Sequence, residues 1–219
     1  MDIDAQIDAV DRALTTGTRD GAETHVQTLA QTYRAPIDDV WDAFTSAERL
    51  PRWFLPVSGE LRLGGRYAIE GNASGTVESC DAPNAFGITW EYGGGVTWVT
   101  VRLSELDADR TRVELEHVAP AADIGAEMWE QFGPSATGIG WDQTLLGLAM
   151  HLTTGEVRPD NSAEWVASDE GVRFMRLSAD RWAGADIASG ADAATARAAA
   201  DTTFAAYTGA APAPAPAED

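Results

Sequence analysis

The feature that most constrains this chain is a succession of six short segments, between residues 58 and 118, in which apolar side chains alternate with polar ones. Turn residues separate the segments, which are 58–63, 66–70, 74–80, 85–92, 96–105 and 110–118. Alternation is typical of a β-strand with one buried face, and Phe86, Ile88 and Trp90 show it in one segment. Strands that follow one another this closely favour an antiparallel meander with one apolar face.

One long helical pattern follows the strands. Between Ser135 and Leu152, the residues Trp141, Leu145 and Leu148 recur at helical spacing along a single stripe. We therefore predict that this segment forms the longest helix of the core, ending at a glycine, Gly155.

Further elements are predicted before the meander. Apolar residues recur at helical spacing near the start of the chain, at Ile3, Ile7, Val10 and Leu14. This spacing predicts an N-terminal helical extension over residues 1–20. Residues 24–33 are rich in Thr and Val and predict a first strand. Two short helices are then expected before Pro56.

After the long helix, two more helical segments are predicted, at about 162–187 and 191–207. Together they make a C-terminal helical extension over residues 160–208. The alternation of Ala and Pro that closes the sequence has too few apolar side chains to fold, so we expect a disordered tail over 209–219.

The charge of the chain limits its partners. The formal net charge is −20, and all 15 basic residues are Arg, with no Lys. A field this negative repels phosphate backbones and anionic lipid heads, so we expect neither nucleic acid nor a membrane as a partner. The lack of Lys also excludes chemistry that passes through a lysine Schiff base.

The rest of the composition indicates a soluble cytoplasmic protein with one core. Cys80 is the only cysteine, so no internal disulfide is expected. The first residues are acidic and lack the basic start and apolar run of a signal peptide. No apolar run approaches the length of a membrane span.

No motif for a metal or a cofactor is found, and we expect neither. The three histidines, His25, His117 and His151, do not have the spacing of metal ligands, and no H-E-x-x-H pattern occurs. No G-x-S-x-G pattern marks a nucleophilic serine.

Several motifs together resemble a known family. They are Tyr33-Arg34-Ala35-Pro36 through Trp41, Arg52-Trp53-Phe54, Leu61 through Tyr67, Gly75-Thr76-Val77, Thr111 through His117, and Gly140-Trp141. The set resembles the START-like SRPBCC superfamily over about residues 23–153, and within it the group named for the activator of the heat-shock-protein-90 ATPase. This resemblance implies an α+β helix-grip fold over 23–155, in which a curved antiparallel sheet wraps around the long C-terminal helix.

The resemblance also implies a binding cavity between sheet and helix, which in relatives holds small hydrophobic or aromatic molecules. The residues expected to bind such a ligand are Trp53, Phe54, Trp90, Val101, Leu115, His117, Trp129, Phe132, Trp141 and Leu145. Aromatic walls with few polar groups suit a small apolar ligand. The alternative for any one of these aromatic residues is that it simply fills the core.

His117 is the one candidate for catalysis. Strand alternation puts it on the same face as Val113 and Leu115, toward the expected cavity. A histidine there would orient a ligand or act as an acid or base, with Glu127 or Asp142 as a partner. The alternative is a structural histidine held by hydrogen bonds.

Three functions follow as hypotheses. The leading one is binding of a small hydrophobic or aromatic molecule without catalysis. The second is a cyclase-like or dehydratase-like enzyme that uses His117. The third takes the family name literally and is an interaction module that binds a chaperone and stimulates its ATPase. A homodimer is left open as a partner.

Overall fold

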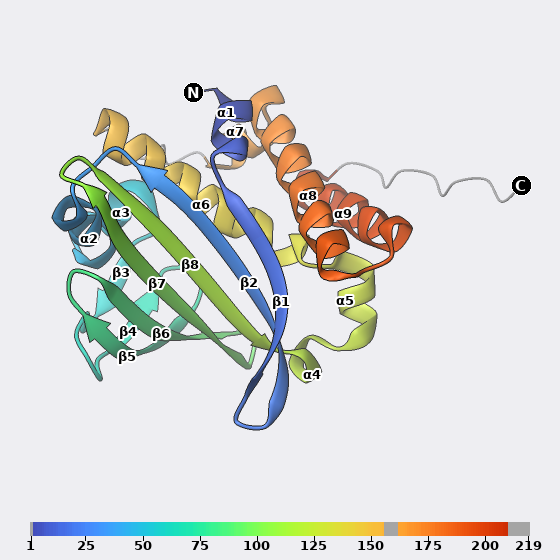
Figure 1. The fold of residues 1–219 in the computed structure, drawn as a ribbon, viewed down its shortest axis with the longest axis horizontal. Coiled ribbons are helices and arrows are strands. Elements are labelled where there is room, and N and C mark those ends of the chain that lie inside the picture. Colours follow the sequence, from blue (N-terminus) through green and yellow to red (C-terminus); the bar gives the residue numbers. More distant parts are fainter. Residues whose placement is uncertain (1, 156–161, 210–219) are drawn as a thin grey trace, which may run out of the picture.

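The computed structural model describes residues 2–155 and 162–209, and in this part of the chain one antiparallel sheet of eight strands curves around a long helix (Figure 1). The strands are β1 (Asp11–Arg19), β2 (Ala22–Tyr33), β3 (Val57–Gly59), β4 (Arg66–Ile69), β5 (Ser74–Asp81), β6 (Ala85–Tyr92), β7 (Gly95–Asp107) and β8 (Arg110–Pro120). Their order across the sheet is β1-β2-β8-β7-β6-β5-β4-β3.

The helices divide into those that close the sheet and those that extend the domain. The first group is α2 (Ile37–Thr45), α3 (Leu50–Trp53), α4 (Ala121–Ile124), α5 (Ala126–Phe132) and α6 (Ser135–Thr154). The second group is α1 (Ile3–Asp8), α7 (Ser162–Ala167), α8 (Asp169–Ser189) and α9 (Ala193–Thr208). None of the helices in residues 2–155 and 162–209 is long and apolar enough to cross a bilayer.

The α+β helix-grip fold predicted from the sequence is confirmed. Strands β3 to β8 are neighbours in chain order, so they form the predicted meander, and β2 pairs with β8 at its far side. One predicted strand, 58–63, is shorter than expected and ends at Gly59. The chain turns between residues 60 and 65, where Gly64 takes a φ of 74° that suits glycine.

The predicted helix over residues 1–20 is correct only for its first part. Helix α1 ends at Asp8, and Asp11–Arg19 forms β1, which pairs along its whole length with β2. Two residues, Asp20 and Gly21, connect the strands with φ values of 52° and 82°. An Asp-Gly pair between extended segments is a strong signal for a tight hairpin, and it outweighs the helical spacing of four apolar residues.

Helix α6 is buried on two faces, whereas the sequence predicted one apolar stripe. Trp141, Leu145 and Leu148 belong to the core against the sheet. Ile139 and Leu146 belong to a second core, which α6 shares with α1, α8 and α9. Apolar side chains are therefore needed on two faces of the helix, as expected for a helix between two layers.

A glycine on α6 permits the close contact with α8. A Cβ atom on Gly138 would lie 2.3 Å from the indole ring of Trp182, which is fully buried. The ring thus occupies the space that any other residue at this position would need.

Residues 210–219 of the predicted disordered tail lie outside the described residues.

Candidate functional site

A cavity of about 130 Å³ lies between the sheet, α3 and the middle of α6, and we call it the inner cavity. Its wall comes from α2, α3, strands β3 to β8, the loop before β4, and two residues of α6, Trp141 and Thr144. Most of the exposed wall is apolar, because the strands present the apolar face of the meander to it. The cavity is thus the part of the helix-grip interior that side chains leave unfilled.

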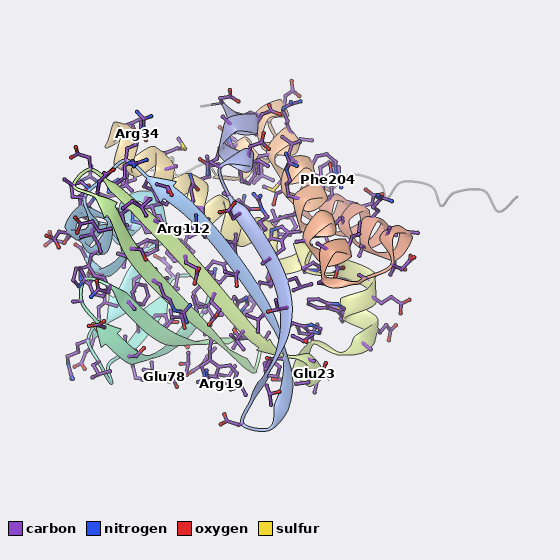
Figure 2. All side chains as sticks on the ribbon, viewed as in Figure 1. Arg19, Glu23, Arg34, Glu78, Arg112 and Phe204 are labelled. Carbon is purple, nitrogen blue, oxygen red and sulfur yellow. The ribbon has the colours of Figure 1, made fainter. Side chains whose placement is uncertain are left out.

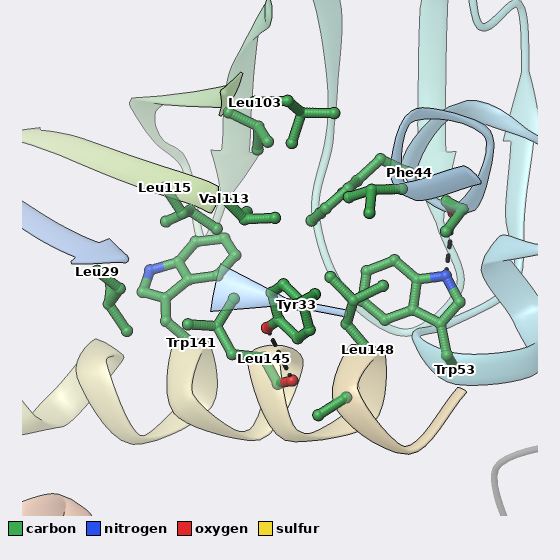
Figure 3. Close-up of a cluster of buried hydrophobic side chains, with 14 of the residues drawn as sticks. Leu29, Tyr33, Phe44, Trp53, Leu103, Val113, Leu115, Trp141, Leu145 and Leu148 are labelled. Atoms are coloured by element: carbon green, nitrogen blue, oxygen red, sulfur yellow. Dashed lines mark hydrogen bonds between the residues drawn. The ribbon is translucent and has the colours of Figure 1, made fainter. Parts of the chain in front are cut away.

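Six of the ten residues predicted to bind a ligand line the inner cavity. They are Trp53, Phe54, Trp90, Val101, Leu115 and Trp141. Figure 3 shows Trp53 and Trp141 at two ends of a row of buried side chains, with Leu145 and Leu148 between them on α6. Four predicted residues, His117, Leu145, Trp129 and Phe132, lie elsewhere.

Other residues of the wall were not among the predicted ones, and they include Phe44, Tyr67, Ile69, Phe86 and Ile88. A signal for two of them was present, because Phe86 and Ile88 share a strand face with Trp90. Phe44, by contrast, comes from α2, and only the folded chain brings it to the cavity.

The N–H and O–H donors of three wall residues are already used inside the protein. The indole N–H of Trp53 donates to the Ala43 carbonyl at 3.0 Å (Figure 3), and the Tyr67 hydroxyl donates to the Thr89 carbonyl at 2.7 Å. The indole N–H of Trp141 donates to Nδ1 of His117 at 3.1 Å. These groups therefore present carbon surface, and no free donor, to the cavity.

His117 lies behind this wall, buried and hydrogen-bonded on both ring nitrogens. Because Nδ1 accepts from Trp141, the ring proton is on Nε2, which donates to the Thr97 hydroxyl at 2.8 Å. Burial lowers the pKa of His117 to about 4, so the ring is neutral at pH 7. In this arrangement His117 orients Trp141 and has no free nitrogen for an exchange of protons with a ligand.

Asp142, considered from the sequence as a partner of His117, is committed to another network. It accepts from Nε of Arg12 at 3.1 Å, from the Trp182 indole at 3.2 Å and from the hydroxyl of Ser178. Burial raises the pKa of Asp142, and Arg12 opposes that shift. The buried pair joins β1, α6 and α8, so the role of Asp142 is to hold the layers together. Glu127 is exposed on α5 and lines neither the inner cavity nor the core.

Leu145 lies in the core beside the cavity. Its side chain is fully buried against the sheet, and its carbonyl accepts the Tyr33 hydroxyl at 3.1 Å (Figure 3).

Trp129 and Phe132 are on α5, which leads away from the inner cavity. The Trp129 ring stacks on His25 with centroids 3.6 Å apart, and the Phe132 carbonyl accepts from Thr203 of α9 at 2.7 Å. Because α5 packs against the C-terminal extension, these two aromatic residues are absent from the wall of the inner cavity.

Comparison with known proteins identifies the family. The family model for "Activator of Hsp90 ATPase homolog 1-like protein" matches residues 34–153. No curated protein matches the chain. The crystal structure of CalU16 from Micromonospora echinospora is 34% identical, with a TM-score of 0.66, and the match covers 81% of this chain and 98% of CalU16. This share is larger than residues 34–153 alone, so the likeness continues into the extensions.

Two more distant structures show the same fold. EF2215 from Enterococcus faecalis is 15% identical with a TM-score of 0.57, and the match covers 81% of this chain and 92% of that protein. DynU16, a protein in the dynemicin biosynthetic locus, is 21% identical with a TM-score of 0.50, and the match covers 61% of this chain and 49% of DynU16. At these identities the likeness concerns the fold alone.

Proposed function

This chain belongs to the family of activator of Hsp90 ATPase homolog 1-like proteins, and we propose that it binds a small neutral aromatic or hydrophobic molecule in the inner cavity of its helix-grip fold. The observation that carries the proposal is the wall of this cavity. Its surface is mostly carbon, and the donors of Trp53, Tyr67 and Trp141 are engaged by protein acceptors. A polar ligand would lose its hydrogen bonds to water there and gain few in return.

The size of the cavity favours a molecule of about one aromatic ring. Its volume is about 130 Å³. An apolar cavity of roughly 150 Å³ in another protein remains dry and takes up benzene, so a similar apolar space is a suitable host for a single ring.

The aromatic side chains of the wall supply the contacts that a ring would need. Trp90 and Trp141 meet edge to face with centroids 5.2 Å apart, and Phe44 and Trp53 do the same at 5.2 Å. Such pairs expose both ring faces and ring edges, and each additional aromatic contact contributes about 0.5–1.5 kcal/mol beyond the area that it buries. The wall therefore favours a flat ring over an aliphatic chain.

Binding without catalysis agrees best with the state of His117. Both of its nitrogens have partners, its pKa is lowered to about 4 by burial, and its side chain is not part of the cavity wall. An acid or base must reach the proton that it transfers. We therefore assign His117 the task of holding Trp141 in position.

A titration with toluene tests the proposal. We expect toluene to shift the indole N–H signals of Trp53, Trp90 and Trp141 in a saturable way in NMR spectra of the ¹⁵N-labelled protein. The variant Val101→Phe should abolish these shifts, because its new ring occupies the space of the ligand.

The matched control is Val96→Phe, the same change on the same strand at an exposed position. It should leave binding intact. The cost of Val101→Phe in stability is a second readout. Overpacking a filled core costs about 1–3 kcal/mol, so a smaller loss is expected if the ring enters empty space. Toluene shifts that persist in Val101→Phe, or that are absent from the wild-type protein, contradict the proposal.

A further inference from the structure

A second and larger cavity, which we call the outer cavity, lies away from the helix-grip interior. Its volume is about 400 Å³, it is open to solvent on one side, and it is lined by the start of β2, by α4 and α5, by the end of α8 and by the start of α9. Figure 2 shows Glu23, a lining residue of this cavity, near the start of β2 beside α4. The β2 residues and the α8 and α9 residues that line it lie outside the segment 34–153 that matches the family model.

Asp186 lines the outer cavity with a carboxylate that has no partner in the part of the chain that the structure describes. The residue is 7% exposed, and among the described residues its side chain accepts no hydrogen bond and forms no ion pair. Its backbone carbonyl is engaged, since it accepts from the backbone N–H of Ala191 at 3.1 Å and from the Ser189 hydroxyl at 2.7 Å. These bonds fix the backbone at Asp186, and the carboxylate oxygens are not among the fully buried side-chain atoms of the described residues, so they face the solvent of the cavity.

The place of Asp186 in its helix makes the charge more costly. It lies in the last turn of α8, where the helix dipole places a partial negative charge of about half an electron. Burial also raises the pKa of Asp186, because the ionised carboxylate is less stable away from water. A cation placed beside a carboxylate at the negative end of a helix therefore stabilises both charges.

Two stacked aromatic rings form part of the wall of the same cavity. Trp129 stacks on His25 with the two ring planes 2° apart, and both residues line the space. Burial lowers the pKa of His25, with Glu23 opposing the shift, so the ring is neutral at pH 7 and does not compete as a cation. The indole of Trp is the side chain that attracts cations most strongly through its π system.

The remaining lining residues define the kind of cation. Glu23 and Glu130 add two exposed carboxylates, and no Arg is found among the described residues of the wall. The described residues include no group of three His, Cys, Asp or Glu side chains arranged to hold a metal ion. Small apolar side chains at Ala196 and Ala199 leave room for carbon groups. These features favour an organic cation over a bare metal ion.

We propose that the outer cavity binds a small organic ammonium ion, with the charged nitrogen at Asp186 and the carbon groups against Trp129. The net charge of −20 supports the capture of such an ion, because the summed field raises the local concentration of cations. This site is independent of the inner cavity in position and in the chemistry that it selects.

Benzyltrimethylammonium is a suitable probe, and benzyl alcohol is its neutral counterpart. In NMR titrations we expect benzyltrimethylammonium to shift the backbone amide of Asp186 and the indole N–H of Trp129 with saturation. Benzyl alcohol should produce no saturable shift at these positions. The variant Asp186→Asn keeps the shape of the side chain and removes its charge, and it should weaken binding about tenfold or more.

The control variant is Glu127→Gln, which changes the net charge by the same amount on α5 without touching the cavity wall. It should leave the affinity within about twofold, because exposed charges away from a site contribute little. Equal weakening in both variants would mean that the ion responds only to the overall field, and it would overturn the proposal. Saturable shifts from benzyl alcohol of the same strength, or no saturable shift with benzyltrimethylammonium, would overturn it as well. Shifts at Trp53 or Trp90 report on the inner cavity, so the two proposals can fail separately.

Discussion

The inner and outer cavities differ in how their polar groups are satisfied. The inner cavity is the smaller one, at about 130 Å³ against about 400 Å³, and the donors of Trp53, Tyr67 and Trp141 in its wall have protein acceptors. In the outer cavity, Asp186 is 7% exposed, and its side chain has no hydrogen-bond or ion-pair partner among the described residues. A cavity whose wall is mostly carbon selects a ligand by shape and dispersion, whereas one that holds an unpaired charge favours a ligand of opposite sign. The volumes of the two cavities alone would not indicate that they select different kinds of ligand.

The largest change in stability is expected at Asp142, a buried carboxylate that, unlike Asp186, is held by partners. Its side chain is 1% exposed and is held by Arg12, whose side chain is 4% exposed. We expect Asp142→Ala to lower the free energy of unfolding by about 3–5 kcal/mol, because it leaves Arg12 buried and unpaired. Urea unfolding followed by circular dichroism measures this. A loss below about 1 kcal/mol would show that the pair is not the link between β1, α6 and α8.

An effect of intermediate size is expected at His117, behind the wall of the inner cavity, when the pH falls. The pKa of His117 is about 4 in the folded protein and 6.5 in an unperturbed histidine. The unfolded chain therefore takes up the proton first, so the contribution of His117 to stability is complete above pH 6.5 and is lost as the pH falls to about 4. The loss amounts to about 3 kcal/mol.

The variant His117→Gln isolates this contribution, because other carboxyl groups titrate equally in both proteins. The difference in unfolding free energy between wild type and variant should shrink as the pH is lowered from 6.5 to about 4. A difference that does not change with pH would mean that His117 has the same pKa in the folded protein as in the unfolded chain, as a histidine open to solvent would. It would then be open to the acid or base role that the geometry argues against.

The smallest effect has the opposite sign and belongs to the outer cavity. Asp186→Asn removes a charge that has no partner and lies at the negative end of α8. We expect it to raise the free energy of unfolding at pH 7 by about 0.5–1 kcal/mol. Parallel urea unfolding with Asp142→Ala provides the contrast, since one buried carboxylate should stabilise the protein and the other destabilise it. Destabilisation by Asp186→Asn would indicate that its carboxylate has a structural partner.

The sheet and the long helix could be predicted because their signals are local. Alternation in segments such as 85–92 determines both the strand and the face that it buries, and the observed β6 has the same bounds. The N-terminal strand was missed although its signal was also local. The Asp20-Gly21 pair marks a hairpin, but the spacing of Ile3 and Ile7, which are helical, was extended too far along the chain.

The parts of the candidate site that could not be predicted depend on distant contacts. The position of His117 on an inward face was predictable, but its hydrogen bonds come from Thr97 on another strand and from Trp141 on α6. Trp129 is of a residue type that often lines a ligand cavity, yet its ring stacks on His25, which is far away in the sequence. Asp186 carries no signal at all in a helix rich in charged residues, because its isolation exists only after α5 and α9 have packed around it.

The central claim is that the inner cavity accepts a single aromatic ring between Trp53, Trp90 and Trp141. A crystal of the protein soaked in iodobenzene tests it most directly, because the anomalous signal of iodine locates the ligand without assumptions about its shape. We predict an iodine peak inside the inner cavity, with the Trp53 and Trp141 side chains still bonded to Ala43 and His117. A filled interior without iodine, or iodine only at the surface, would contradict the account.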